Sequence, residues 1–179
     1  MRINQLVWQH GGMAALISVI LSLVAYILGV ELLIGWQLGL AQSVLIITTM
    51  FVVSRAIRLD EGGYISYWRV FQHIMLSLLC ILSGSALFNF VLFNLINPEL
   101  VDVVVDISLE KVEVMMISFG LEGDLLQETL SETEKEIRNG YTLAGSIKGI
   151  VFSSIFGGII ALIVSATQYK IDHQKPNFN

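Results

Sequence analysis

The sequence predicts an all-α integral membrane protein with four transmembrane helices and an outer, helical hairpin-like loop between the third and the fourth. The 179-residue chain is 55% hydrophobic and only 14% charged, whereas soluble domains average about 25% charged residues. Charges are also absent from four long runs, residues 11–30, 32–54, 70–98 and 149–169. Each run meets or approaches the roughly 20 helical residues that cross a bilayer core. The few polar residues of so short a chain could not cover four such helices in a soluble core.

The four runs form one expected domain over residues 1–179. We expect spans at about 12–33, 36–54, 72–96 and 146–168, with an outer amphipathic segment at 98–140. The first span is expected to be retained, because its apolar part is longer than a signal-peptide core and no A-x-A site closes it.

The basic residues predict how the spans are oriented, because Lys and Arg near span ends stay on the cytoplasmic side. Six of the ten basic residues fall on one side of the four spans: Arg2, Arg55, Arg58, Arg69, Lys170 and Lys175. The loop from Asn97 to Tyr141, on the other side, holds eleven of the fifteen acidic residues. We therefore expect both termini in the cytoplasm. Arg55, Arg58 and Arg69 anchor this topology, and they are also candidates to bind lipid headgroups or a partner.

Small residues predict where helices approach one another, because association within lipid depends on close packing. The fourth span has six of them at four-residue spacing: Gly145, Gly149, Ser153, Gly157, Ala161 and Ser165. The first span has a seam that alternates steps of four and three: Gly11, Ala15, Ser18, Ser22, Ala25 and Gly29. Both patterns favour packing within a four-helix bundle, and the row on the fourth span could alternatively form a homodimer interface.

Polar side chains inside the third span have two interpretations. Ser85, Asn89 and Asn94 could hydrogen-bond to other helices and hold the bundle together. They could instead line a path for a solute, although such paths more often carry Asp, Glu, Lys or Arg at mid-depth. The single cysteine, Cys80, can form neither an intrachain disulfide nor a cysteine metal cluster.

The long loop is expected to form two amphipathic helices. Asn97 and Pro98 have the residue types of an N-cap and a first helical residue. A second helix is expected from about Leu121 to Asn139, ended by Gly140, with an acidic face exposed to water. The acidic spacing fits no EF-hand loop and no His-containing metal site, so we expect no metal and no cofactor.

The sequence lacks the common motifs of catalytic and nucleotide-binding sites. It contains no nucleophile elbow, Walker loop, HExxH or CxxC motif. A net charge of −5 and the lack of a basic stripe argue against binding nucleic acid. We therefore expect a protein that is not an enzyme.

The order of these features resembles the family of domain of unknown function 4199, a family of small bacterial membrane proteins. The resemblance rests on the segments RLDEGGYISYWRVF, NFVLFNLINPELVD and GLEGDLLQETLSETEKEI, followed by the small-residue fourth span. It implies a four-helix inner-membrane protein, and it implies no activity and no functional residues.

Three functional hypotheses follow. The first is a structural or partner-binding membrane subunit, with a homo-oligomer among the options. The second is a small transporter or channel subunit that acts as an oligomer. The third, an enzyme that acts on lipid, is the weakest because no acid and base stand out as a pair.

Overall fold

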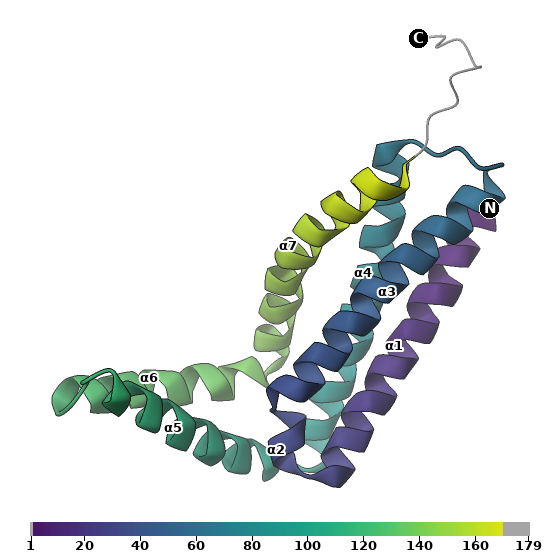
Figure 1. Cartoon of the computed structure of the whole chain (residues 1–179). Helices are drawn as coiled ribbons and strands as arrows, with labels where there is room; N and C mark the ends of the chain where they lie inside the picture. The colour runs from purple at the N-terminus through teal and green to yellow at the C-terminus, as the bar shows by residue number, and fades with distance from the viewer. Residues whose placement is uncertain (1, 170–179) are drawn as a thin grey trace.

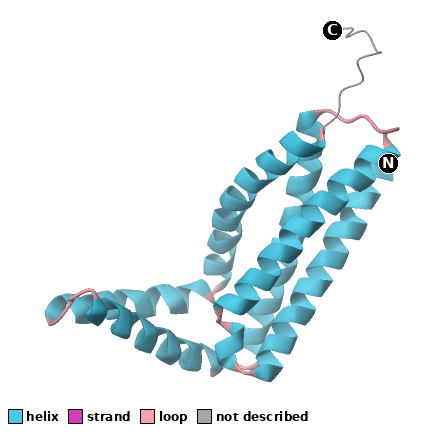
Figure 2. Ribbon diagram, in the orientation of Figure 1, coloured by secondary structure: helices cyan, strands magenta, loops and turns pink. Residues whose placement is uncertain are grey.

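The computed structural model describes residues 2–169, with side chains from residue 5 onward, so the predictions that rest on Lys170 and Lys175 lie outside the described residues. Every regular element in this range is helical (Figure 2). The elements are α1 (Arg2–Leu28), α2 (Val30–Leu33), α3 (Trp36–Asp60), α4 (Tyr67–Val91), the π-helical turn η1 (Leu92–Ile96), α5 (Leu100–Ser118), α6 (Asp124–Gly140) and α7 (Leu143–Gln168).

The long helices α1, α3, α4 and α7 run side by side as a bundle (Figure 1), and α4 packs against the other three. All four are long and apolar enough to cross a membrane. Large apolar side chains are exposed on their outward faces, among them Leu16, Ile20, Ile27, Val44, Phe51, Leu87, Val151, Ile155 and Ile163. Soluble monomers rarely expose so continuous an apolar surface, so these faces contact lipid. The predicted fold class is confirmed.

The short helices α5 and α6 form a hairpin that projects to one side of the bundle (Figure 1). We call the end of the bundle that carries it the hairpin end, and the end with the turn at residues 61–66 the loop end. The N-terminus lies at the loop end (Figure 1). Helix α5 contacts α2, and α6 contacts α7.

The observed spans differ from the expected bounds where the backbone bends. The first expected span is divided because Gly29 has a φ of 138°, which ends α1 and sets off the single turn of α2. The second span continues to Asp60, because the chain first turns at Gly62 and Gly63, whose φ values are 77° and 96°. Glycine is favoured at such positions because it has no Cβ atom.

The start of the hairpin was predicted wrongly. Asn97 does not cap a helix: α5 begins at Leu100, with Glu99 as its N-cap residue. The Asn97 amide still donates to the carbonyl of Leu92, 2.9 Å away, and so closes η1. Its side chain donates to the Tyr26 hydroxyl at 3.3 Å, which ties this turn to α1.

The second hairpin helix begins at Asp124 and not near Leu121. Gly120 and Gly123 both have positive φ, 80° and 67°. These two residues hold a turn that delays the helix.

Two clusters of buried residues hold the fold together. The larger lies at the loop end and joins α1, α3, α4 and α7 through residues such as Val7, Ile57, Ile74, Leu78 and Val164. The smaller lies at the hairpin end and consists of Leu92, Phe93, Leu100 and Val104. Ile137 and Tyr141 pack against the smaller cluster, so it fixes the hairpin to the bundle.

Candidate functional site

The row of small residues on α7 is packed in one half and open in the other. At the loop end, a Cβ atom at Gly157 would lie 2.5 Å from Leu78 Cδ2, and Ala161 and Ser165 are fully buried. Towards the hairpin end, a Cβ at Gly149 would meet nothing within 4 Å, and Ser153 is exposed. Helix α7 therefore packs closely on α4 near the loop end and is separated from it near the hairpin end.

The separation leaves a cleft of about 290 Å³ between α4 and α7. The polar side chains of Ser85, Asn89, Ser146 and Ser153 line it, together with Tyr141. Three residues of the α7 row, Gly145, Gly149 and Ser153, form part of its wall. The small size of Gly149 and Ser153 keeps the cleft open, whereas Gly145 is needed for the turn before α7, since a Cβ atom there would overlap the carbonyl oxygen of Asn139.

A second cavity of about 340 Å³ lies against the other side of Asn89, towards α1 and α3. Asn89 and Tyr141 line both cavities. The second cavity also meets Ser22 and Gln42, which are joined by a hydrogen bond of 3.0 Å from the Gln42 amide to the Ser22 hydroxyl. Ser18 and Ser85 lie 2.8 Å apart at their hydroxyl oxygens and form a further link between α1 and α4.

This polar region was predicted only in part. Ser85 and Asn89 were singled out from the sequence, whereas Ser18 and Ser22 were interpreted only as small packing residues. Gln42 was missed, although an amide in the middle of an apolar run is a signal that such groups face the bundle interior. The serines of α1 serve both purposes, because they are small enough for close approach and carry a hydroxyl.

Asn94 has a different role from Asn89. Its amide nitrogen donates to the carbonyls of Phe90 and Tyr141, each 2.9 Å away, and thereby fastens the turn before α7. The Asn89 side chain forms no hydrogen bond with any residue from 2 to 169. An unpaired amide in an apolar setting favours a polar ligand or water, so Asn89 is the focus of the candidate site.

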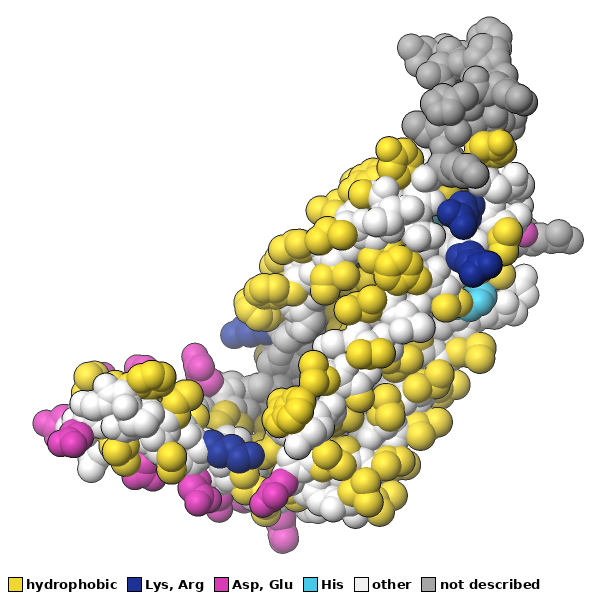
Figure 3. All heavy atoms as spheres, in the orientation of Figure 1, with side chains coloured by type: hydrophobic (Ala, Val, Ile, Leu, Met, Phe, Trp, Pro, Cys, Tyr) yellow, Lys and Arg dark blue, Asp and Glu magenta, His cyan; other side chains and the backbone are white. Residues whose placement is uncertain are grey.

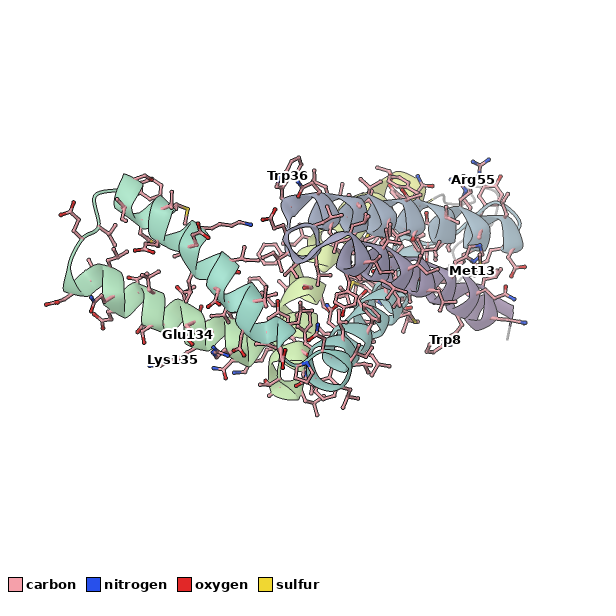
Figure 4. All side chains as sticks on the ribbon, turned by 90° about the horizontal axis from the view of Figure 1, so that it is seen from below. Trp8, Met13, Trp36, Arg55, Glu134 and Lys135 are labelled. Atoms are coloured by element: carbon pink, nitrogen blue, oxygen red, sulfur yellow. The ribbon has the colours of Figure 1, made fainter. Side chains whose placement is uncertain are left out.

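The three arginines lie at the other end of the bundle. Arg55 and Trp36 are at opposite ends of α3 (Figure 4), and Trp36 is at the hairpin end. Arg69 Nε is 2.9 Å from Glu61 Oε1, so part of its charge is balanced within the protein. Arg55 is exposed and Arg58 half-buried, and both remain accessible to a headgroup or a partner.

The hairpin carries most of the acidic charge. Acidic side chains gather at its tip and along its edges (Figure 3). Arg138 joins the two hairpin helices, because its Nη1 is 2.6 Å from Asp102 Oδ1 and its Nε is 2.8 Å from Glu134 Oε1. These hydrogen bonds, the one to Asp102 first, raise the pKa of Arg138. Within residues 2–169, no three His, Cys, Asp or Glu side chains are close enough to hold a metal ion.

Tyr141 completes the base of the site. Its ring lies against that of Phe93, with centroids 4.0 Å apart. Burial raises the pKa of its hydroxyl, so the group stays protonated at neutral pH. The arrangement can bind a small polar group or exclude lipid, and it presents no nucleophile with a neighbouring base.

Comparison with known protein families identifies a match. The DUF4199 family, described as proteins of unknown function, matches residues 9–167. No curated protein and no solved structure matches the chain.

Proposed function

The chain belongs to the DUF4199 family of proteins of unknown function, and we propose that it is a non-enzymatic subunit of the bacterial inner membrane that binds a partner protein. The observation that supports this proposal is the hairpin, which projects to one side of the bundle (Figure 1). Its far part exposes large apolar side chains: Val114, Met115, Ile117, Phe119 and Leu125.

The apolar surface of α5 is wider than α6 can cover. The acidic residues of α5 follow one narrow stripe at steps of four, four and three: Asp102, Asp106, Glu110 and Glu113. Most of the remaining circumference is apolar. Helix α6 offers the narrow stripe Leu126, Leu130 and Ile137 to cover it, and apart from the exposed Leu125 its other faces are polar. Exposed apolar surface rimmed by charge is typical of protein interaction sites, and here it supports a docked partner.

The test is purification from native membranes in a mild detergent. We expect a stoichiometric partner to accompany the parent protein and to be lost from the double variant Val114→Asp/Phe119→Asp. Glu110→Gln, on the acidic stripe of the same helix, should retain it. A molar mass of two or more copies, lost with the same double variant, would identify the partner as the chain itself. Equal recovery of partner with both variants would refute a role for the hairpin tip.

The proposal includes an orientation, with the loop end in the cytoplasm. The positive-inside rule supports it through Arg55, Arg58 and Arg69. Single cysteines at Ala56 and at Ser131, in a Cys80-free background, should react differently with an impermeant reagent on cells whose outer membrane has been permeabilised. Labelling at Ser131 alone is the expected result, and labelling at Ala56 alone would reverse the topology.

A transporter or channel subunit is the second candidate, favoured by the two cavities that share Asn89 and Tyr141. Reconstituted protein would then move a small polar solute across liposome membranes. Asn89→Leu should abolish that flux, whereas Leu87→Val, at an exposed position of α4 outside both cavities, should preserve it. Liposomes that are no leakier than empty ones would eliminate this candidate.

A further inference from the structure

The corner where α6 meets α7 contains a hollow of about 870 Å³. Helix α6 belongs to the sideways hairpin and α7 to the bundle, so the chain changes direction sharply between Gly140 and Leu143 (Figure 1). The hollow is lined from α6 by Glu136 and Asn139, and from α7 by Lys148 and Phe152. One wall therefore comes from a hairpin helix and the other from a membrane-spanning helix.

The corner is held by specific contacts. Thr142 Oγ1 donates to the carbonyl of Asn139 at 2.7 Å and accepts from the amide of Gly145 at 3.0 Å. The carbonyl of Tyr141 accepts a hydrogen bond from the Asn94 amide, 2.9 Å away. The ring of Tyr141 contacts the ring of Phe93. The walls of the hollow thus have a fixed relation to each other.

Two opposite charges face the hollow, and neither is paired with another side chain of residues 5–169. Lys148 is exposed and lies five residues after the start of α7, about 7.5 Å along the helix. It therefore lies on the bilayer side of the corner. An ammonium group there requires an anion or must reach to the interface. Glu136 is exposed on α6, a helix that is not among the four membrane-spanning ones, so it lies nearer to the water than Lys148.

An apolar surface continues from Lys148 into the bilayer. Gly149 leaves open space beside the helix axis, with nothing within 4 Å of a Cβ atom. Phe152, on the wall of the same hollow, is 65% exposed, and Ile155 and Phe156 extend the exposed surface further. An acyl chain could lie along this face.

From these features we infer that the corner binds a zwitterionic aminophospholipid such as phosphatidylethanolamine. Lys148 binds the phosphate, Glu136 binds the terminal ammonium group, and the acyl chains follow α7 past Gly149 and Phe152. The order of groups in the lipid supports this assignment. From the bilayer interior to the water, the lipid presents acyl chain, phosphate and amine, and the corner presents apolar surface, Lys148 and Glu136 in the same order.

Other ligands match the corner less well. An anionic lipid without an amine would satisfy Lys148 but would bring a second negative charge near Glu136. A direct ion pair between Lys148 and Glu136 would need no ligand. The experiment separates these cases from the proposal.

The test measures which lipids stay on the full-length protein. Purified protein is exchanged into detergent with phosphatidylethanolamine or phosphatidylglycerol, and bound lipid is counted by native mass spectrometry. We expect phosphatidylethanolamine to be retained about tenfold better, the factor that a charge-assisted hydrogen bond contributes. Lys148→Gln should reduce the retention of both lipids. Glu136→Gln should remove the preference between them, and Lys135→Gln is the matched control that should keep it.

The swapped double variant Lys148→Glu/Glu136→Lys distinguishes a lipid from a direct ion pair. It reverses the order of the charges, so the proposal expects loss of phosphatidylethanolamine retention. If the swap restores thermal stability that each single charge reversal, Lys148→Glu and Glu136→Lys, has lost, the two residues pair directly and the proposal is wrong. Equal retention of both lipids by the parent, or an unchanged preference in Glu136→Gln, would also overturn it. Gel filtration of each variant verifies that it is folded, which is expected because both side chains are exposed.

Discussion

The two halves of α7 have the same pattern of small residues and opposite packing. Near the loop end, Gly157 lies against Leu78 and Ala161 is fully buried. Near the hairpin end, Gly149 and Ser153 face open space at the α4–α7 cleft. Small residues at four-residue spacing therefore permit close approach of a second helix but do not cause it.

The contact between Phe93 and Tyr141, next to the hairpin, accounts for the difference. The rings of Phe93 and Tyr141 lie together between the end of α4 and the start of α7, with centroids 4.0 Å apart. Asn94 holds the carbonyl of Tyr141 in place. These two rings, tilted by 37° to each other, keep the helix backbones apart at this end, so α7 converges on α4 only towards the loop end.

The largest expected effect lies in the packed half. Gly157→Leu should lower the stability of the protein in detergent by about 1–3 kcal/mol, the usual cost of overpacking. Its first side-chain atom would already overlap Leu78, which is buried and cannot move aside freely. Thermal unfolding followed by circular dichroism measures the loss.

Ile155→Leu is the control for this prediction, because Ile155 is exposed on the lipid face of the same helix. It should unfold at the same temperature as the parent. A folded monomer obtained from Gly157→Leu, where the parent is an oligomer, would instead place the row at an interface between copies.

A smaller effect is expected where α1 meets α4. A Cβ atom at Gly84 would lie 2.9 Å from that of Ala15, so Gly84→Ala should force the two helices apart slightly and cost about 1 kcal/mol. Gly12→Ala provides the contrast, since a Cβ there meets nothing within 4 Å and alanine favours a helix. If both variants gain stability, the α1–α4 seam is looser than it appears in the structure.

Replacing Asn94, which holds Tyr141 between α4 and α7, should have a modest and local effect. Asn94→Leu removes the hydrogen bond to the Tyr141 carbonyl and should cost about 0.5–1.5 kcal/mol. Hydrogen exchange should become faster at the turn between α6 and α7 and stay unchanged along α1. Leu95→Val, at an exposed neighbouring position, is the control, and equally fast exchange in both variants would show that Asn94 does not hold the corner.

The sequence was sufficient to predict the four spans, because a short chain has too few polar residues to bury several long uncharged helices in a soluble core. The small seam of α1 also indicated a real contact, with Gly11 close to the backbone of Ser77 and Ser18 buried. The α4–α7 cleft could not be predicted, since it depends on two aromatic rings from distant parts of the chain. Asn97 misled for a related reason: its type suits an N-cap, but η1 and Tyr26 occupy its hydrogen-bonding groups.

The smallest expected effect is in the open half, and it tests the comparison most directly. Gly149→Leu places a large side chain on the same row as Gly157→Leu, two turns away. Since nothing lies within 4 Å of a Cβ atom there, the side chain should extend into the cleft or into lipid and leave the unfolding temperature within the range of neutral substitutions, about ±0.5 kcal/mol. The molar mass of the purified protein should also stay the same. A loss of stability as large as that of Gly157→Leu would mean that the cleft is closed when the protein is in the membrane. In that case a lower molar mass would show that another copy's helix had filled it, and an unchanged mass would show that α4 itself closes on α7. Neither outcome fits a cleft held open by Phe93 and Tyr141, so this one substitution decides whether the two halves of α7 differ in the bilayer as they do in the structure.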